Sequence, residues 1–344
     1  MSRTLWAIVL AFSGLILTRS WALASIDHAP AKPPPDRPDV PCLVVPSSVE
    51  AYTTTAWQTE TPIPTARHDF GLAAQPGSYY LYAFGGVVSA TDMLTSTERY
   101  NTCSQQWEAL APLPEPRGYV SAVEIDGRYY VVGGVERIVS GTFEVRNSTY
   151  AYDPVSDAWT RLADLPQALG GVAVATANGK LYAFGGFDSR GYHHGNVDTT
   201  YEYNPVVNTW LTRTALISGT RSLAGAASLN GKIYLVGGIT DGDPYTATLG
   251  TLIIYDPAAD TWQPGASVSQ NRSLALAVAP DNAIYAFGGE GGEGALYNRY
   301  DPVLNQWDRL STYYADPYRS GVGAAYSRGR LFIVGGYDSF FTLT

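Results

Sequence analysis

The sequence predicts an all-β protein built from repeats. Three observations support this class: an apolar stretch that ends in two glycines recurs, a tryptophan recurs at the same interval, and turn-forming dipeptides separate the apolar runs. The glycine pairs end at Gly86, Gly134, Gly186, Gly238, Gly289 and Gly336. Their spacing of 47 to 52 residues is in the range of propellers and solenoids. We therefore expect six structural units.

Each apolar run before a glycine pair predicts a buried strand. The residue three positions before the first glycine is aromatic in every copy: Tyr82, Tyr130, Tyr182, Tyr234, Tyr285 and Phe332. The residue directly before the glycine is Phe or Val. Aromatic and β-branched residues in a short run that stops at glycines are typical of a buried strand followed by a tight bend.

A second marker predicts a hairpin in each repeat. Tryptophans recur at Trp57, Trp107, Trp159, Trp210, Trp262 and Trp307. Five of them follow a tyrosine by seven residues: Tyr100, Tyr152, Tyr203, Tyr255 and Tyr300. Four of these tyrosines open an Asp-Pro or Asn-Pro turn. A strand, a proline turn and a strand with one large aromatic residue indicate a hairpin.

The glycine pair, the tyrosine and the tryptophan together resemble the kelch repeat, over roughly residues 50–344. The resemblance implies a six-bladed kelch-type β-propeller over residues 47–344. Each repeat would form one four-stranded blade, with its first strand beside a central channel.

The ends of the chain are expected to interlock. The first tryptophan precedes the first glycine pair, and no tryptophan follows the last pair. The N-terminal strand around Trp57 should therefore complete the last blade, begun by residues 322–336, and remove an open sheet edge. The third strand of that blade would come from residues 340–344 or from residues near Tyr52, and the sequence leaves both open.

The first 24 residues resemble an export signal. Arg3 lies in a short basic start, residues 5–17 are apolar, and Ala22-Leu23-Ala24 fits a cleavage site. The alternative is an uncleaved membrane anchor, although the apolar core is shorter than the ~20 residues of a membrane span. We expect a secreted, periplasmic or extracellular protein that is not stably inserted in a membrane after cleavage.

Residues 25–46 are rich in proline and predict an extended tether. The chain has two cysteines, Cys42 and Cys103. In an oxidising compartment a disulfide between them would join the tether to the first repeat. The alternative is a pair of free thiols. Two cysteines alone do not form a zinc site, and no metal site is expected.

The charge balance excludes one class of partner. The net charge is −9 and the pI is near 4.9, whereas nucleic acid requires a basic surface. We expect a single-domain, monomeric body without a nucleic-acid partner.

Arginines mark one rim of the predicted ring. Nine residues before the first hairpin turn of each repeat stand Arg67, Arg117, Arg221, Arg272 and Arg319, with Leu169 in the sixth place. Counting along antiparallel strands places each arginine beside the loop that follows its glycine pair. The resulting hypothesis is an arginine-lined channel mouth that binds an acidic peptide or an anionic glycan. The alternative is that each arginine pairs with a neighbouring carboxylate and fixes the start of the strand.

Long loops on the same rim add Tyr192, His193 and Tyr245. Their rings could stack on a sugar or hold a peptide. The alternative is that they are ordinary loop residues in a tyrosine-rich chain.

The sequence carries no recognisable catalytic motif, and no cofactor is expected. Two enzymes with kelch-like blades offer a comparison. Galactose oxidase binds copper with histidines and tyrosines, but the cysteine that its site requires would have to be Cys103, on the wrong side of the blade. N-acetylneuraminate epimerase would give the arginines a sugar-acid ligand, but the repeats lack an insertion that could shape a deep pocket. The leading hypothesis is an exported, non-enzymatic binding module, and the epimerase is the alternative.

Overall fold

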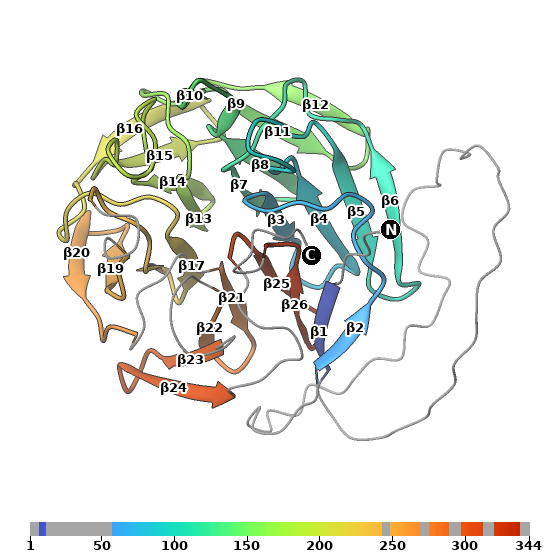
Figure 1. Cartoon of the computed structure of the whole chain (residues 1–344). Helices are drawn as coiled ribbons and strands as arrows, with labels where there is room; N and C mark the ends of the chain where they lie inside the picture. Colours follow the sequence, from blue (N-terminus) through green and yellow to red (C-terminus); the bar gives the residue numbers. More distant parts are fainter. Residues whose placement is uncertain are drawn as a thin grey trace, which may run out of the picture.

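The structure is a computed structural model that describes residues 7–11, 57–242, 248–268, 275–288, 297–311 and 320–337. Every regular element in these ranges is a β-strand. The strands form antiparallel four-stranded sheets arranged around a central axis (Figure 1). The predicted all-β propeller is confirmed.

Five blades each come from one uninterrupted stretch of sequence. Blade 1 contains β3 (Gly71–Ala74), β4 (Tyr80–Phe84), β5 (Thr97–Asn101) and β6 (Gln106–Leu110). Blade 2 contains β7 (Ser121–Ile125), β8 (Arg128–Val132), β11 (Thr149–Asp153) and β12 (Ala158–Arg161). Blade 3 contains β13 (Ala173–Ala177), β14 (Lys180–Phe184), β15 (Thr200–Asn204) and β16 (Thr209–Arg213). Blade 4 contains β17 (Gly225–Leu229), β18 (Lys232–Val236), β19 (Leu252–Asp256) and β20 (Thr261–Pro264). Blade 5 contains β21 (Ala275–Ala279), β22 (Ala283–Phe287), β23 (Tyr297–Asp301) and β24 (Gln306–Ser311).

A further sheet, the terminal sheet, combines both ends of the chain. It holds β25 (Gly323–Ser327), β26 (Arg330–Val334), β1 (Ala7–Ala11) and β2 (Trp57–Glu60), in the spatial order β2-β1-β26-β25. The strand of Trp57 therefore shares a sheet with β26, and β1 lies between them as the third strand of that sheet. Both segments predicted for the third strand, residues 340–344 and those near Tyr52, lie outside the described residues.

β1 comes from the segment predicted to be the core of an export signal. In the structure Ala7 pairs with Val334 and with Glu60 across the two neighbouring strands. A short apolar run is compatible with a buried strand and with a signal core alike. The sequence pattern therefore could not separate the two.

The first strands of the sheets surround the axis. β3 contacts β7, β7 contacts β13, and the contacts continue through β17, β21 and β25 back to β3. Figure 1 shows these strands nearest the centre, with the fourth strands outermost. This order agrees with what the kelch resemblance implies for the first strand of each blade.

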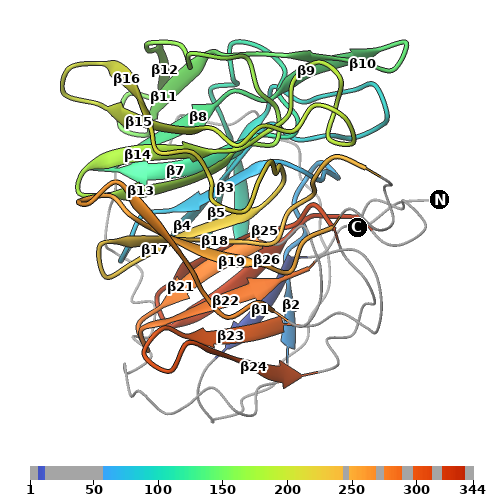
Figure 2. The same cartoon turned by 90° about the vertical axis from the view of Figure 1, so that its left-hand side faces the viewer.

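One loop on the rim forms a β-ribbon. β9 (Val135–Val139) and β10 (Thr142–Val145) pair with each other outside the blades. The ribbon extends beyond blade 2 on the rim that follows the glycine pairs (Figure 2).

The tyrosine and tryptophan of each repeat pack between adjacent blades. Phe84 of blade 1 makes edge contacts with Tyr152 and Trp159 of blade 2, at ring centroid distances of 6.1 and 5.6 Å. Phe184 contacts Tyr255 and Trp262 of blade 4 in the same way. The hydrophobic core therefore lies between sheets, and it is repeated at each boundary.

The same tryptophans fasten each blade to the connector before it. The indole nitrogen of Trp159 donates to the carbonyl of Ala111 at 2.8 Å, and the amide of Ala111 donates to Asp157 at 2.8 Å. Asp157 also accepts from the Tyr152 hydroxyl at 2.6 Å. Asn208, Asp260 and Asn305 accept equivalent pairs of bonds. We call this arrangement the blade latch.

The glycine pairs allow close approach of neighbouring blades. The amide of Gly186 donates to the carbonyl of Arg221 at 2.8 Å, and Gly86 does the same to Arg117 at 2.7 Å. Gly185 has φ of 59°, and a Cβ there would lie 2.0 Å from the Arg221 oxygen. A side chain at this position would collide with the next blade.

Cys103 lies in the turn between β5 and β6 and is disulfide-bonded. Cys42 is the only other cysteine of the chain and lies outside the described residues. No helix in the described ranges is long and apolar enough to cross a membrane.

Candidate functional site

The structure places three of the predicted arginines inside the blades. Arg67, Arg117 and Arg221 are at most 1% exposed. Arg67 donates to the carbonyls of Thr65 and Gly85 at 3.0 and 2.9 Å and forms an ion pair with Glu98. Burial lowers the pKa of Arg67 to about 10, although Glu98 acts in the opposite direction. A guanidinium held in this way offers no donor to a ligand at the surface.

Arg221 and Arg117 have similar roles. Arg221 donates to the carbonyl of Gly237 at 3.1 Å and to Thr251 at 3.0 Å, and burial lowers its pKa to about 10. Arg117 donates to Ser148 at 2.6 Å and pairs with Glu115. The predicted basic channel mouth is therefore wrong for these three positions, because each arginine bonds within its own repeat. Arg272, Arg319 and Tyr245 lie outside the described residues.

Among the described residues, the backbone turns into the left-handed region two residues after the arginine position of the repeat. This occurs at five equivalent positions, where φ lies between 47° and 65°: Asp69, Tyr119, Gly171, Leu223 and Gly321. Amide groups in this set bond to carbonyls one blade away: Asp69 to Gly321 at 2.9 Å, Gly171 to Tyr119 at 2.8 Å and Leu223 to Gly171 at 2.9 Å. We call these five residues the entrance collar.

Three of the collar residues, Asp69, Tyr119 and Leu223, are not glycine, and their left-handed backbone conformation costs free energy. Non-glycine residues in the left-handed region cost about 1–3 kcal/mol each, and such residues concentrate at functional sites. Among the described residues with positive φ, Tyr119 and Leu223 are the only aromatic and aliphatic side chains. Glycine fills the equivalent place in two other repeats, so the backbone does not require a side chain there.

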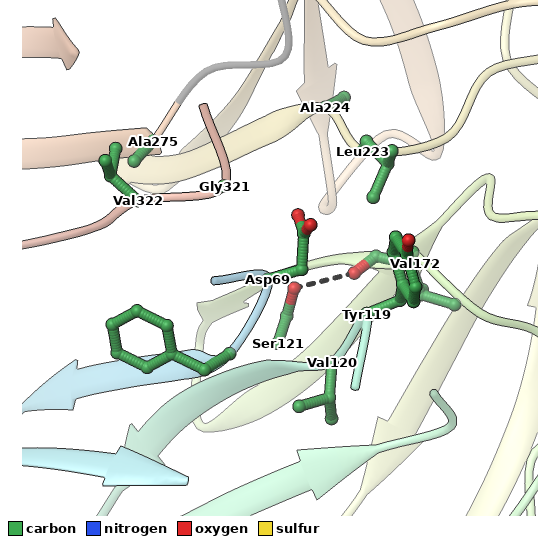
Figure 3. Close-up of a pocket in the computed structure, with 12 residues that line it drawn as sticks. Asp69, Tyr119, Val120, Ser121, Val172, Leu223, Ala224, Ala275, Gly321 and Val322 are labelled. Atoms are coloured by element: carbon green, nitrogen blue, oxygen red, sulfur yellow. Dashed lines mark hydrogen bonds between the residues drawn. The ribbon is translucent and has the colours of Figure 1, made fainter. Parts of the chain in front are cut away.

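The collar borders a small cavity of about 80 Å³ at the channel entrance. It is lined by collar residues and by the starts of the inner strands, including Ser121, Val172 and Ala275. In Figure 3 the side chains of Asp69 and Leu223 point toward the same opening. Small-molecule sites usually enclose ~300–1,000 Å³. The described cavity is therefore too small to enclose a sugar acid.

Asp69 is fixed within the collar by its neighbour. Its Oδ2 lies 2.6 Å from His68 Nδ1, and both side chains are largely buried, at 14% and 16% exposed. The His68 ring lies edge-on to Tyr337, at 4.8 Å, and to Tyr119, at 6.5 Å. These contacts hold the carboxylate beside aromatic rings at the channel entrance.

An aromatic cluster extends the collar outward. It consists of Tyr119, Phe143, Phe187 and Tyr192, with neighbouring ring centroids 5.4 to 6.0 Å apart. Phe143 comes from the β9–β10 ribbon and Tyr192 from the loop between β14 and β15. The centroid of the His193 ring lies 4.2 Å from that of Tyr192, and the two rings are tilted by 56°. The structure thus joins the predicted Tyr192 and His193 to the collar through Tyr119.

Sequence reasoning missed Asp69, Tyr119 and Leu223. A signal was available, since each follows an arginine of the repeat by two residues. The residue type changes from repeat to repeat, so a search for recurring identities passes over this position.

The structure gives no support to the copper hypothesis. Cys103 is disulfide-bonded, and its amide bonds to Asn101 in the β5–β6 turn, at the end of the strands opposite the collar. Across the described ranges, no three His, Cys, Asp or Glu side chains form a group that could hold a metal ion.

Comparison with known proteins identifies the repeat. A family profile, the KLHDC2/KLHL20/DRC7 Kelch-repeats domain, matches residues 38–215 and 163–336. The chain belongs to the kelch-repeat family. Kelch-like protein 25 of Xenopus tropicalis is 28% identical over 257 residues, which cover 73% of this chain and 42% of that protein. Kelch-like protein 35 of Mus musculus is 31% identical over 72% of this chain and 40% of that protein.

This kelch chain thus spans less than half the length of the curated relatives it matches. Among solved structures, that of YjhT superimposes with a TM-score of 0.69 at 18% identity. The alignment covers 82% of this chain and 94% of that one. At this level of identity the similarity shows the fold alone.

Proposed function

We propose that this kelch propeller is a non-enzymatic interaction module that binds a segment of a partner protein at the entrance collar and the aromatic cluster. The observation that carries the proposal is the pair of left-handed side chains, Tyr119 and Leu223, kept where glycine would relieve strain. Rigid aromatic rings beside a small cavity suit a peptide laid across the entrance better than an enclosed small molecule.

The proposal is tested by selecting binders from a displayed library of random twelve-residue peptides. The collar variant carries Asp69→Asn, Tyr119→Asn and Leu223→Asn, because asparagine tolerates the left-handed region. The matched control carries Val155→Asn, Val206→Asn and Val303→Asn, which lie in the β11–β12, β15–β16 and β23–β24 turns and are 87, 91 and 84% exposed. These turns lie at the end of the strands opposite the collar.

We expect peptides selected on the wild-type protein to bind the collar variant at least tenfold more weakly and the control variant equally well. Thermal unfolding checks that both variants stay folded. The collar would be ruled out as the binding site if the wild type, the collar variant and the control variant bound the peptides equally well. It would also be ruled out if only the control substitutions weakened binding.

The acidic peptide or anionic glycan remains a prediction from the sequence. Arg221→Ala would not test anion binding alone, since it would also remove the hydrogen bond from Arg221 to the Gly237 carbonyl of its own blade. The composition of the selected peptides, together with binding of sulfated and sialylated glycans to the wild-type protein, tests it directly.

Export and ring closure also belong to the proposal. We propose a six-bladed ring in which the terminal sheet is the sixth blade, closed by N-terminal strands.

Cleavage of the export signal after Ala24 would remove β1 from that sheet, so another segment would have to take its place beside β26. Mass spectrometry of the protein recovered from the culture medium or periplasm reports whether residues 1–24 are absent.

A further inference from the structure

We propose that the partner inserts a cationic side chain, a lysine or an arginine, at the collar and that Asp69 binds it. This inference rests on the proposed function and specifies the chemistry of its ligand. It is the reverse of the acidic ligand that the arginine positions suggested.

The first support is the charge at the entrance. The described residues that line the cavity include one carboxylate, Asp69, and no lysine, arginine or histidine. Arg67, Arg117 and Arg221 are buried and bonded to their own repeats. The exposed arginines of the neighbouring rim loops, Arg137, Arg146 and Arg190, each pair with a carboxylate of the same loop. The positive charge expected at the channel mouth is therefore absent from its described lining, and a negative charge is present.

The second support is the geometry of Asp69. The backbone at φ of 47° and the amide bond to Gly321 fix its Cα in the collar. His68 Nδ1 holds one carboxylate oxygen, Oδ2. Figure 3 shows the carboxylate directed into the opening. A partly buried carboxylate attracts a cation more strongly than an exposed one, because water screens the pair less.

The third support is the surroundings of that carboxylate. Tyr119 lines the same cavity as Asp69, and an aromatic ring attracts ammonium and guanidinium groups that reach its face through cation–π attraction. Gly171 and Gly321 carry no side chain, which keeps the space open. A cavity of about 80 Å³ has room for a compact charged head group. The net charge of −9 favours encounter with cationic segments as well.

The test extends the peptide selection to the single variant Asp69→Asn. Peptides from the wild-type selection should be enriched in Lys or Arg, and this enrichment should disappear on the variant. The strongest arginine-containing peptide is then compared with the same peptide carrying citrulline, a neutral analogue of arginine, by fluorescence polarisation. We expect citrulline to weaken binding at least tenfold to the wild-type protein and less than threefold to Asp69→Asn.

The matched control is Asp92→Asn, which removes one charge from an exposed residue in the loop after β4. It should leave both the enrichment and the citrulline effect unchanged. Selected peptides that are neutral or acidic, or a citrulline effect of equal size on wild type and Asp69→Asn, would overturn the cationic ligand while leaving the collar as a binding site. A selection that yields nothing sensitive to the collar variant would overturn the proposed function itself.

Discussion

At the scale of single residues, the buried arginines act as braces. Arg67 and Arg221 each donate to the carbonyl of the first glycine in their own repeat, Gly85 and Gly237. The planar guanidinium offers several donors in a fixed arrangement, so one side chain can bond to a carbonyl and to a partner on the next strand at once. Removing either arginine would leave those buried acceptors without a partner.

The blade latch is a second device at this scale. Aspartate and asparagine alternate as the acceptor, yet each receives one bond from a tyrosine hydroxyl and one from a backbone amide. The two bonds require an acceptor oxygen in a fixed place, but that oxygen does not have to carry a charge. Asp and Asn also both tolerate the positive φ, of 49° to 53°, found at Asp157, Asn208 and Asp260.

We predict that Asp260→Asn preserves stability at neutral pH. Asp260→Ala should lower the free energy of unfolding by about 1–3 kcal/mol, because the Tyr255 hydroxyl and the Thr214 amide lose their shared acceptor. Burial alone would raise the pKa of Asp260, but the Tyr255 hydroxyl and the Thr214 donors more than offset it, and the pKa is lowered. A lowered carboxyl pKa contributes stability above pH ~4 that is lost as the pH falls through the folded-state value. Wild type should therefore lose more stability than Asp260→Asn between pH 5 and pH 2.

Urea unfolding across that pH range measures the difference. The matched control is Asn208→Asp, which should gain an acid-dependent loss that wild type lacks at this position. Parallel pH profiles for wild type and both variants would contradict the role of Asp260.

At the scale of elements, the glycine pair determines how closely neighbouring sheets pack. Its second amide bonds to the next blade, and its first Cα lies where a Cβ would overlap a carbonyl oxygen of that blade. The first glycine at the strand end is therefore required by sterics between blades as well as by local backbone conformation.

An alanine in the left-handed region costs ~1–2 kcal/mol from backbone strain alone. We predict that Gly185→Ala lowers the free energy of unfolding by well over that amount, because its Cβ would lie 2.0 Å from the Arg221 carbonyl oxygen. The control is Gly231→Ala in the β17–β18 turn, where φ is 74° and no atom lies within 4 Å of a Cβ. It should cost only about 1 kcal/mol. Chemical denaturation at constant m-value compares them, and equal losses would show that contact between blades is not the cause.

At the scale of the whole molecule, the junction between the terminal sheet and blade 1 has a latch of its own. Blade 1 has Gln105 where the other blades have Asp or Asn, and Tyr100 donates instead to Glu60 of β2, at 2.8 Å. The other oxygen of Glu60 pairs with Arg330 of β26. Glu60 thus connects three strands from distant parts of the sequence.

Replacing Glu60 with leucine is predicted to lower the free energy of unfolding by about 3 kcal/mol, since it leaves Arg330 and the Tyr100 hydroxyl buried without their partner. Asp164→Leu is the control, because Asp164 and its partner Arg161 are 35 and 59% exposed, and it should cost less than ~1 kcal/mol. Similar losses for the two variants in urea unfolding would contradict a special role for Glu60 at this junction.

The sequence by itself determined the class of fold, the strands before the glycine pairs, and the tyrosine and tryptophan contacts. It could do so because these features recur at each blade boundary and depend on residues of fixed type: a glycine where no Cβ fits, an aromatic ring where two sheets meet. It also singled out Tyr192 and His193, which do lie beside the channel entrance.

Only the tertiary structure decided which way the arginines face, which strand lies between β26 and β2, and which residues form the collar. Arg221 lies on the predicted rim, but its direction depends on acceptors 16 and 30 residues away. Asp69, Tyr119 and Leu223 share no residue type, and the site they form arises only when blades about 50 residues apart in sequence meet around one axis.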